Sequence, residues 1–152
     1  MEKFNHIELN NEVTKRGDNG FFKLEKDIEA IEEFLREVDF RTVKFSSEMK
    51  RLRYLVEENF YYNIFEKYIE DEILECLELA ANFKFEFKSY MAASKFYKDY
   101  ALKTNDKKQY LENFNQHVFI VAMYLADGDV ALARELMISM LEQRLQPATP
   151  TF

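Results

Sequence analysis

The chain has 152 residues, which is near the size of one domain and enough to bury a single substantial core. Its 28 acidic residues outnumber its 21 basic ones, and the net charge of −7 argues against a nucleic-acid partner. Three glycines and two prolines are too few for the turns of a sandwich, barrel or propeller, and their positions exclude G-x-G-x-x-G and P-loop motifs. We therefore expect a mainly α-helical single domain.

The cysteine and histidine content limits the chemistry that the chain can perform. The single cysteine, Cys76, allows no internal disulfide and no cysteine-based zinc site, and its leucine neighbours favour an inert buried thiol over a reactive one. The histidines, His6 and His117, lack the Glu-x-x-His spacing of a di-iron bundle, because Lys3 and Phe114 stand three residues before them. No apolar run approaches the roughly 18 residues of a membrane span. The N-terminus also lacks the pattern of a signal peptide. We expect a cytoplasmic protein with no metal ligands and no membrane contact.

The first 24 residues have the weakest helical pattern. Ile7–Val13 alternates weakly and Phe21–Leu24 follows a turn at Gly17–Gly20, so we expect a short N-terminal hairpin. From Glu25 the period changes, and the spacing i, i+3, i+7, i+10 predicts an amphipathic helix with the buried stripe Ile28, Ile31, Leu35 and Val38. Four carboxylates lie mostly off this stripe, and we interpret them as a solvated face rather than a catalytic cluster: Glu29, Glu32, Glu33 and Glu37.

Two further helices are expected in the middle of the chain. Ser46 or Ser47 caps the first, which continues into an aromatic helical turn at residues 60–65 and buries one apolar face, Met49, Leu52, Leu55 and Val56. Glu70–Glu72 opens the second, because carboxylates stabilise the positive end of a helix. Its apolar side consists of Ile73, Leu74, Leu77, Ala80 and Ala81. Phe83–Lys88 then alternates with period 2, which is consistent with either a strand or an extended connector that places three rings in the core.

Three helices are expected in the second half. Ser89 caps a helix over Tyr90–Leu102, with bulk from Met91, Phe96 and Tyr100, and a polar turn follows at Lys103–Lys108. Phe114–Ala126 is the most apolar stretch and is expected to be the central helix. Gly128 suits a left-handed cap and Asp129 can cap the last helix, which ends near Arg144 and buries Val130, Ala133, Met137, Met140 and Leu141.

The last residues have an extended pattern. Pro147 and Pro150 enforce extended backbone, and Thr151 and Phe152 are typical of a strand. A strand needs a partner, and no upstream segment is an obvious one. The pattern is consistent with either a frayed tail or the start of a sheet or barrel that lies beyond this sequence.

Four segments resemble the N-terminal region of one enzyme family, in the family's order. They are Gln143-Arg-Leu-Gln-Pro-Ala-Thr-Pro-Thr-Phe152; Ile7-Glu-Leu-Asn-Asn-Glu-Val13 with Gly20-Phe-Phe-Lys-Leu-Glu-Lys-Asp27; Arg51-Leu-Arg-Tyr-Leu-Val56; and Ser94-Lys-Phe-Tyr-Lys-Asp-Tyr-Ala-Leu-Lys-Thr-Asn-Asp-Lys107. Together they resemble the large (alpha) subunit of class Ib ribonucleoside-diphosphate reductases, of the Gram-positive bacterial or phage type. The last segment is the most specific of the four.

The resemblance implies a thiyl-radical oxidoreductase that reduces ribonucleoside diphosphates to deoxyribonucleoside diphosphates. The radical comes from a separate, metal-containing small subunit, so the resemblance implies no cofactor within this chain. It also implies that the catalytic cysteines lie in the remainder of the large subunit, and Cys76 matches none of them. This chain alone is then expected to be inactive, with no catalytic residue of its own. Thr149, in Ala-Thr-Pro-Thr-Phe, corresponds to a threonine that contacts the substrate diphosphate.

The resemblance also implies a domain organisation. Residues 1–45 correspond to a shortened N-terminal cone, residues 46–146 to the helical N-terminal domain, and residues 147–152 to the start of a strand of the α/β barrel. The sequence leaves open whether the cone binds an adenine nucleotide effector: its basic residues are candidates for phosphate contact or ordinary surface cations, namely Lys15, Arg16, Lys23 and Arg41. Two alternatives to the enzyme remain. One is a stand-alone helical interaction module that uses the aromatic segment Phe83–Phe87, and the other is a nucleotide-sensing module.

Overall fold

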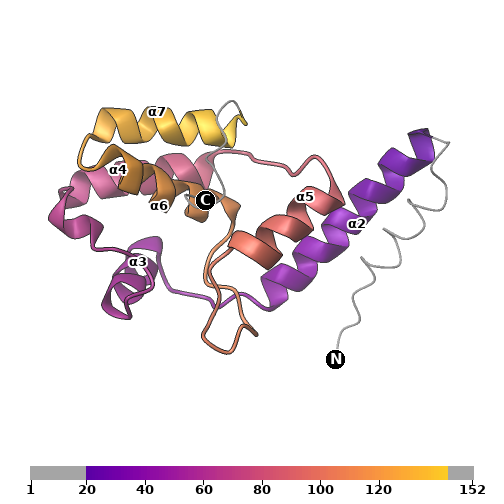
Figure 1. Cartoon of the computed structure of the whole chain (residues 1–152), viewed down its shortest axis with the longest axis horizontal. Helices are drawn as coiled ribbons and strands as arrows, with labels where there is room; N and C mark the ends of the chain where they lie inside the picture. Colours follow the sequence, from indigo (N-terminus) through magenta and orange to yellow (C-terminus); the bar gives the residue numbers. More distant parts are fainter. Residues whose placement is uncertain (1–19, 144–152) are drawn as a thin grey trace. The chain divides into compact units, whose positions relative to one another are not determined.

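The computed structural model describes residues 20–143, and it describes side chains from Asp27 onward. Within this range the chain is mainly helical and has no β-strand, which confirms the expected fold class (Figure 1). No described helix is long and apolar enough to cross a membrane. The described residues form two compact units. Unit 1 comprises residues 20–43 and Glu86–Leu111, and unit 2 comprises Lys44–Phe85 and residues 112–143.

Unit 1 is built from two helices that lie side by side (Figure 1). The long helix α2 spans Gly20–Phe40, α5 spans Tyr90–Lys95, and a π-helical turn, η2, continues α5 over Phe96–Tyr100. The Ser89 hydroxyl accepts a hydrogen bond from the Ala92 amide, as the sequence predicts. The backbone of Tyr110 bridges to Thr42 and to Lys103, which joins the end of α2 to the polar turn.

The predicted N-terminal hairpin is wrong in its second strand. Phe21–Leu24 belongs to α2, which begins at Gly20, and Ile7–Val13 lies outside the described residues. The sequence spacing explains this result, because Phe21 and Leu24 stand seven residues before Ile28 and Ile31 and continue the same helical period. The weak alternation near Gly20 is therefore overridden by the longer helical pattern.

The buried face of unit 1 also differs from the predicted one. In α2, Ile28 is 48% exposed, while the buried residues are Ala30, Ile31, Glu33, Phe34 and Val38. The face is rotated because α5 packs against Phe34, whose ring contacts those of Tyr90 and Tyr97. The helix predicted over Tyr90–Leu102 loses its regular period after Lys95, where η2 begins. Met91 was expected to be buried but is 77% exposed, because the inward face contains Ala93, Phe96 and Tyr97.

Unit 2 contains a closely packed group of three helices. They are α4 over Glu70–Asn82, α6 over Phe114–Ala126 and α7 over Val130–Leu141. The predicted bounds of α6 are confirmed, and eight of its residues are buried. The cap predicted at Asp129 is confirmed by its hydrogen bond from the Leu132 amide. Asp127 and Gly128 both have positive φ, so the chain reverses through two left-handed residues rather than one.

Two shorter elements complete unit 2. The helix α3 spans Glu48–Glu57 and is capped by Ser47, and the short 3-10 helix η1 spans Ile64–Glu66. In α3 the leucines Leu52 and Leu55 are buried as predicted, but Arg51 joins them in place of Met49 and Val56. In α4, Ile73, Leu77 and Ala80 are buried as predicted, whereas Leu74 and Ala81 are exposed because they point off the packed face.

The segment Phe83–Lys88 is an extended connector, not a strand. Within unit 2, the ring of Phe85 stacks on that of Phe114 with centroids 4.0 Å apart. Within unit 1, the ring of Phe87 contacts those of Phe96 and Tyr97. The alternating phenylalanines therefore contribute rings to both units. The compact units change at residues 43/44, 85/86 and 111/112, and the domain division predicted at residue 45 stays a prediction.

Candidate functional site

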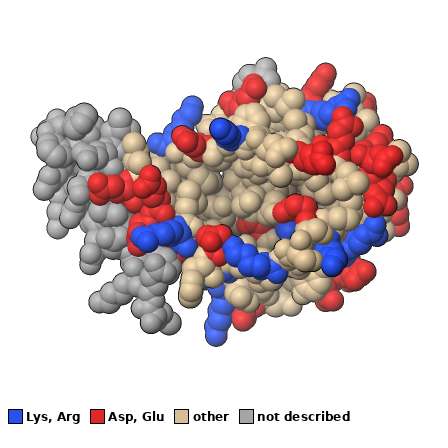
Figure 2. Space-filling view, turned by 180° about the vertical axis from the view of Figure 1, so that it is seen from behind, with Lys and Arg blue, Asp and Glu red and all other residues tan. Residues whose placement is uncertain are grey.

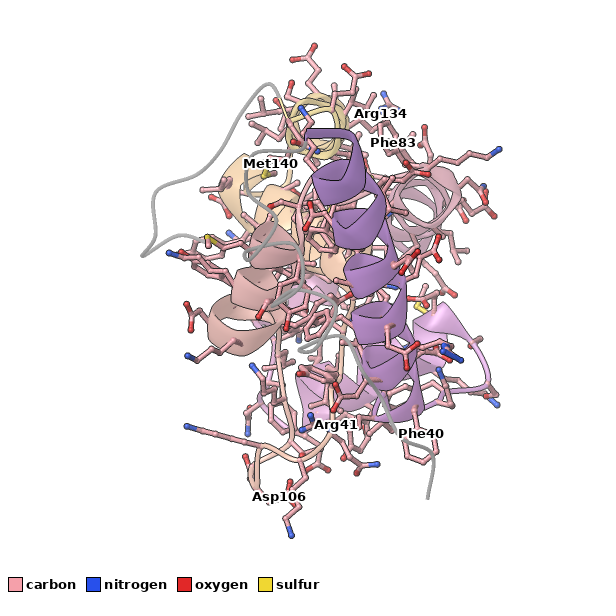
Figure 3. The ribbon with its side chains drawn as sticks, turned by 90° about the vertical axis from the view of Figure 1, so that its right-hand side faces the viewer. Phe40, Arg41, Phe83, Asp106, Arg134 and Met140 are labelled. Carbon is pink, nitrogen blue, oxygen red and sulfur yellow. The ribbon has the colours of Figure 1, made fainter. Side chains whose placement is uncertain are left out.

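The structure describes one of the basic residues proposed for phosphate contact. Thr149, Lys15 and Arg16 lie outside the described residues. The structure describes the backbone of Lys23 but not its side chain. Arg41 follows α2 and lies near the turn that contains Asp106 (Figure 3). Its Nε donates to the carbonyl oxygen of Lys108 at 3.0 Å, its Nη1 is 3.9 Å from a carboxylate oxygen of Glu37, and its guanidinium carbon lies 5.2 Å from the ring centroid of Tyr110. Arg41 thus has a role inside unit 1.

The segment with the most specific family pattern, Ser94–Lys107, is also accounted for by contacts within unit 1. The rings of Phe96 and Tyr97 are buried. The ammonium group of Lys103 donates to the carbonyl oxygens of Lys98 at 3.0 Å and Ala101 at 3.2 Å, and it lies 5.6 Å from the centroid of Tyr110. Lys103 therefore donates to carbonyl groups in the last turn of η2 and just after it, the region where helices leave carbonyls without amide partners.

A buried polar network in unit 2 is the candidate functional site. We call it the Glu112 network, and it consists of Glu48, Arg51, Tyr61, Glu112, Gln116 and His117. Arg51, Glu112 and His117 are 3%, 2% and 7% exposed, which is unusual for ionisable residues. Such groups remain charged in a protein interior only when their charges and hydrogen bonds are matched.

Local structure explains how these side chains meet. Arg51 is on the same face of α3 as Leu52 and Leu55, so it points inward with them. Asn59, with φ of 62°, turns the chain after α3. The amide of Tyr61 then donates a hydrogen bond to the carbonyl of Leu55, which holds Tyr61 against α3. Glu112 immediately precedes α6. The N-cap side chain of Asn113 accepts from the Gln116 amide, and the Gln116 side chain accepts from the Asn113 amide, which fixes the first turn that contains His117.

The bonds of the network run from α3 to the start of α6. Arg51 Nη2 donates to the Tyr61 hydroxyl at 2.6 Å, and that hydroxyl donates to Glu112 Oε2. Arg51 Nη2 is also 3.9 Å from Glu112 Oε2, while the other carboxylate oxygen, Oε1, pairs with His117 Nδ1. Both oxygens of Glu112 thus have partners, as a buried carboxylate requires.

A second, outer connection closes the network. Arg51 Nη1 is 3.5 Å from Glu48 Oε2, and Gln116 Nε2 donates to Glu48 Oε1 at 2.8 Å. Glu48 therefore links the arginine of α3 to the first turn of α6 by a path separate from Glu112. Two independent links fix the position of α3 on unit 2 more firmly than either would alone.

The electrostatics of the site keep the central phenol protonated. Burial raises the pKa of Tyr61 well above its usual value, and the neighbouring Glu112 carboxylate raises it further, while Arg51 opposes the shift. The Tyr61 hydroxyl therefore remains a donor to Glu112 over the whole range of neutral pH. The network connects three parts of unit 2: α3, the segment that contains Tyr61, and the start of α6. It also falls short of a metal centre, because no group of three or more His, Cys, Asp or Glu residues among residues 20–143 is placed to hold a metal ion.

Sequence reasoning missed this network. In the sequence His117 has no metal-binding spacing, and no local pattern connects it with Arg51, Tyr61 or Glu112. One signal was present: Arg51 shares the apolar stripe of Leu52 and Leu55, where an unpaired charge is costly. Partners in Glu112 and His117 are more than 60 residues away and have no local signature.

Cys76 agrees with its predicted character. Its thiol is free and fully buried on α4. Burial, followed by the charge of Glu75, raises the pKa of this thiol to about 11. A thiol with that pKa is almost entirely protonated at neutral pH and is a poor nucleophile.

Comparison with known proteins identifies the family. A model described as "Ribonucleotide reductase N-terminal" matches residues 6–85, and one described as "Ribonucleotide reductase, all-alpha domain" matches residues 86–152. The chain is 44% identical over 150 residues to the ribonucleoside-diphosphate reductase NrdEB subunit alpha of Bacillus subtilis (strain 168) and, equally, to that of Bacillus phage SPbeta. These matches cover 97% of this chain and 14% of each relative.

A shorter relative gives the same result. The ribonucleoside-diphosphate reductase subunit alpha of Bacillus subtilis (strain 168) is 43% identical over 148 residues, which is 96% of this chain and 21% of that protein. The chain thus spans between about a seventh and a fifth of the length of these relatives. It belongs to the ribonucleotide reductase N-terminal family and matches the N-terminal region of ribonucleoside-diphosphate reductase alpha subunits.

Proposed function

We propose that this chain acts as the N-terminal region of the alpha subunit of a class Ib ribonucleoside-diphosphate reductase. In this role it contributes to the reduction of ribonucleoside diphosphates to deoxyribonucleoside diphosphates for DNA synthesis, in the cytoplasm. The observation that supports the proposal is identity of 43–44% to alpha subunits over 96–97% of the chain. The NrdEB name of one relative favours class Ib.

The chain's part in this function is structural and positional. The remainder of the alpha subunit supplies the catalytic cysteines, and a separate metal-containing small subunit supplies the radical. Cys76 takes no part, because it is buried and its pKa is raised. Unit 2 provides a scaffold in which the Glu112 network fixes α3 and α6. Thr149 contacts the diphosphate of the substrate through its hydroxyl.

A chimeric enzyme tests the proposal. The matched N-terminal region of the Bacillus subtilis alpha subunit is replaced by residues 1–152 of this chain, and the reduction of CDP is measured with the cognate small subunit. We expect turnover at a substantial fraction of the parent rate, because the replaced region is 43% identical. A chimera that is folded by circular dichroism but has no turnover contradicts the proposal and favours a stand-alone interaction module.

The same chimera tests Thr149. Thr149→Val removes the hydroxyl at nearly constant size, while Thr149→Ser keeps it. Loss of a hydrogen bond to a charged phosphate costs about 1.5–3 kcal/mol, so we expect the valine variant to raise KM for CDP by roughly 10- to 100-fold. Equal KM values for the valine and serine variants contradict the assigned contact.

Titration of the full chain with dATP or dAMP in a calorimeter tests whether residues 1–45 bind an adenine nucleotide effector, with Lys15, Arg16 and Lys23 as the candidate phosphate contacts. Saturable heat supports the effector site. Absence of heat at millimolar nucleotide contradicts the effector site and leaves the reductase proposal intact, since the latter depends on the chimera.

A further inference from the structure

One end of unit 2 exposes large apolar side chains. Ile69 is 66% exposed, Tyr124 is 62% exposed and Leu125 is 40% exposed. The segments that contain them are in contact, because the Tyr68 hydroxyl donates to the carbonyl of Met123 at 2.7 Å. The rings of Tyr62 and Tyr124 also meet, with centroids 5.2 Å apart. We call this surface, formed by Ile69, Tyr124 and Leu125, the Ile69 end.

The exposure of Ile69 has no local explanation in the fold. Ile69 is the N-cap residue of α4, a position that favours Ser, Thr, Asp or Asn because their side chains bond the free amides of the first turn. Its side chain makes no such bond; its amide donates to the Glu72 carboxylate and its carbonyl accepts from the Ile73 amide. An apolar side chain that contributes neither a cap nor burial suggests a contact outside unit 2.

Exposed carboxylates lie in the chain segments next to the apolar residues. Exposed acidic residues lie in the segments that adjoin Ile69 and Tyr124, namely Glu66, Glu70, Asp71, Asp127 and Asp129. Two cations offset part of this charge: Arg53 lies 3.8 Å from Glu70, and Lys67 lies 3.4 Å from Asp127. Figure 2 shows acidic side chains gathered along the right-hand edge, where α4 begins. The Ile69 end therefore combines exposed apolar side chains with neighbouring carboxylates that outnumber the nearby cations, and we call these carboxylates its rim.

We propose that the Ile69 end docks a basic amphipathic helix of another protein segment. Apolar side chains of that helix would cover Ile69 and Tyr124, and its Lys or Arg residues would face the rim carboxylates. The sign of the rim excludes other occupants. An anionic lipid surface or a nucleic acid is repelled, and a second copy of this chain would bring the same negative rim against itself. This inference does not depend on the reductase activity.

A synthetic helix provides the test. The probe is a peptide of about 18 residues, or five helical turns, with Leu on one face and Lys on the other. It is titrated into the full 152-residue chain in a calorimeter, and the contact is mapped by amide chemical shifts. We expect saturable binding with shifts at residues 66–71 and 123–129. The same peptide with Glu in place of Lys is expected not to bind.

Matched variants separate a specific surface from general attraction to an acidic protein. The double variant Ile69→Ser with Tyr124→Ser is expected to weaken binding about tenfold or more, whereas Leu74→Ser with Met91→Ser, which also alters exposed apolar residues, changes it less than about twofold. Charge reversal by Glu66→Lys with Asp71→Lys is expected to weaken binding more than reversal at exposed Glu78 and Glu135. Circular dichroism checks that each variant is folded.

Three outcomes of the binding and variant measurements overturn the proposal, and a fourth is the absence of binding. They are equal weakening by the test and control variants, equal binding of the Glu peptide, and chemical shifts that map to another surface. Absence of saturable binding at millimolar peptide overturns it as well.

Discussion

Units 1 and 2 are held together by different kinds of contact. In unit 1 the centre is a set of aromatic rings: Tyr97 meets Phe34 and Tyr110 edge-on, with centroids 5.9 and 5.4 Å apart. Its buried carboxylate, Glu33, pairs with Arg36. The side chain of Arg36 is 62% exposed, so the positive member of this pair is in contact with water. In unit 2 the buried carboxylate is Glu112, whose side chain is 1% exposed and pairs with the buried side chains of Arg51 and His117.

This difference determines how each unit responds to damage. Loss of a single ring contact is tolerated, because each contributes only about 0.5–1.5 kcal/mol beyond its buried area. A buried ionic network is less forgiving, because removal of one member leaves the others charged and without water. We therefore expect substitutions at a few positions of unit 2 to cost a large free energy of unfolding. In unit 1 we expect smaller losses, spread over many positions.

The largest effect is expected from Glu112→Ala. This change strands Arg51 and the Tyr61 hydroxyl in the interior, and loss of one partner of a buried pair costs about 3–5 kcal/mol. Urea denaturation of the 152-residue chain, followed by circular dichroism, measures the change. Glu78→Ala, on the exposed side of α4, serves as the control and is expected to lie within about 0.5 kcal/mol of the parent. A loss below about 1 kcal/mol for Glu112→Ala would remove the distinction between the units.

A smaller effect is expected in unit 1 from Phe34→Leu. The substitution keeps an apolar side chain but removes edge-on contacts with Tyr90 and Tyr97, so we expect a loss of about 1–2 kcal/mol. Native-state hydrogen exchange locates the effect, with reduced protection in α2 and α5 and little change in α6. A uniform loss across both units would show that they unfold as one.

Three tyrosines of unit 2 sharpen the comparison further. The Tyr68 hydroxyl donates to the Met123 carbonyl, so Tyr68→Phe is expected to cost about 1 kcal/mol. The Tyr62 hydroxyl oxygen is buried and has no hydrogen-bond partner within the part of the chain that the structure describes, and burial raises the pKa of this phenol. Tyr62→Phe is therefore expected to be neutral or to stabilise by up to about 1 kcal/mol. Tyr61→Phe, which breaks the network, is expected to cost more than either. Thermal unfolding of the three variants gives the order, and a costly Tyr62→Phe would contradict it.

The smallest effect concerns Cys76 and pH. Its pKa is about 11 in the folded chain against 9.0 for the free thiol, so the unfolded chain loses this proton first as pH rises. Stability from this group is fully present below pH 9 and decreases between pH 9 and 11. Cys76→Ser is expected to remove that part of the pH dependence. Alkylation by iodoacetamide at pH 7.5 should be far slower than in urea, and equal rates would contradict the burial of the thiol.

Much of the fold is predictable because its signals are local. The caps at Ser47, Ser89 and Asp129 each depend on a side chain three residues from the amide that it satisfies. The bounds of α6 follow from a continuous apolar run between two polar stops. Such features need no knowledge of the rest of the chain.

The errors arise where a distant partner decides the outcome. Ile28 and Met91 satisfy a helical period, but which side of α2 and α5 is buried depends on how those helices pack. The Glu112 network was missed for the same reason, because Arg51 and Glu112 are 61 residues apart in sequence and become a pair only through the fold. The effector site in residues 1–45 and the substrate contact of Thr149 follow only from the family resemblance. No local sequence pattern predicts which groups these residues would contact.

Each unit combines a segment from the first half of the chain with one from the second half, and this has consequences for folding during synthesis and for cleavage of the chain. Unit 1 needs residues up to Leu111, and unit 2 needs Glu112 and the helices that follow it. During synthesis on a ribosome, α2, α3 and α4 therefore emerge before either unit has its full set of packing partners. Their apolar faces can be fully buried only after the second half of the chain has been made. A cut at residue 85/86, where the two family matches meet, would leave both units incomplete. The two halves of this chain are consequently expected to fold together or not at all.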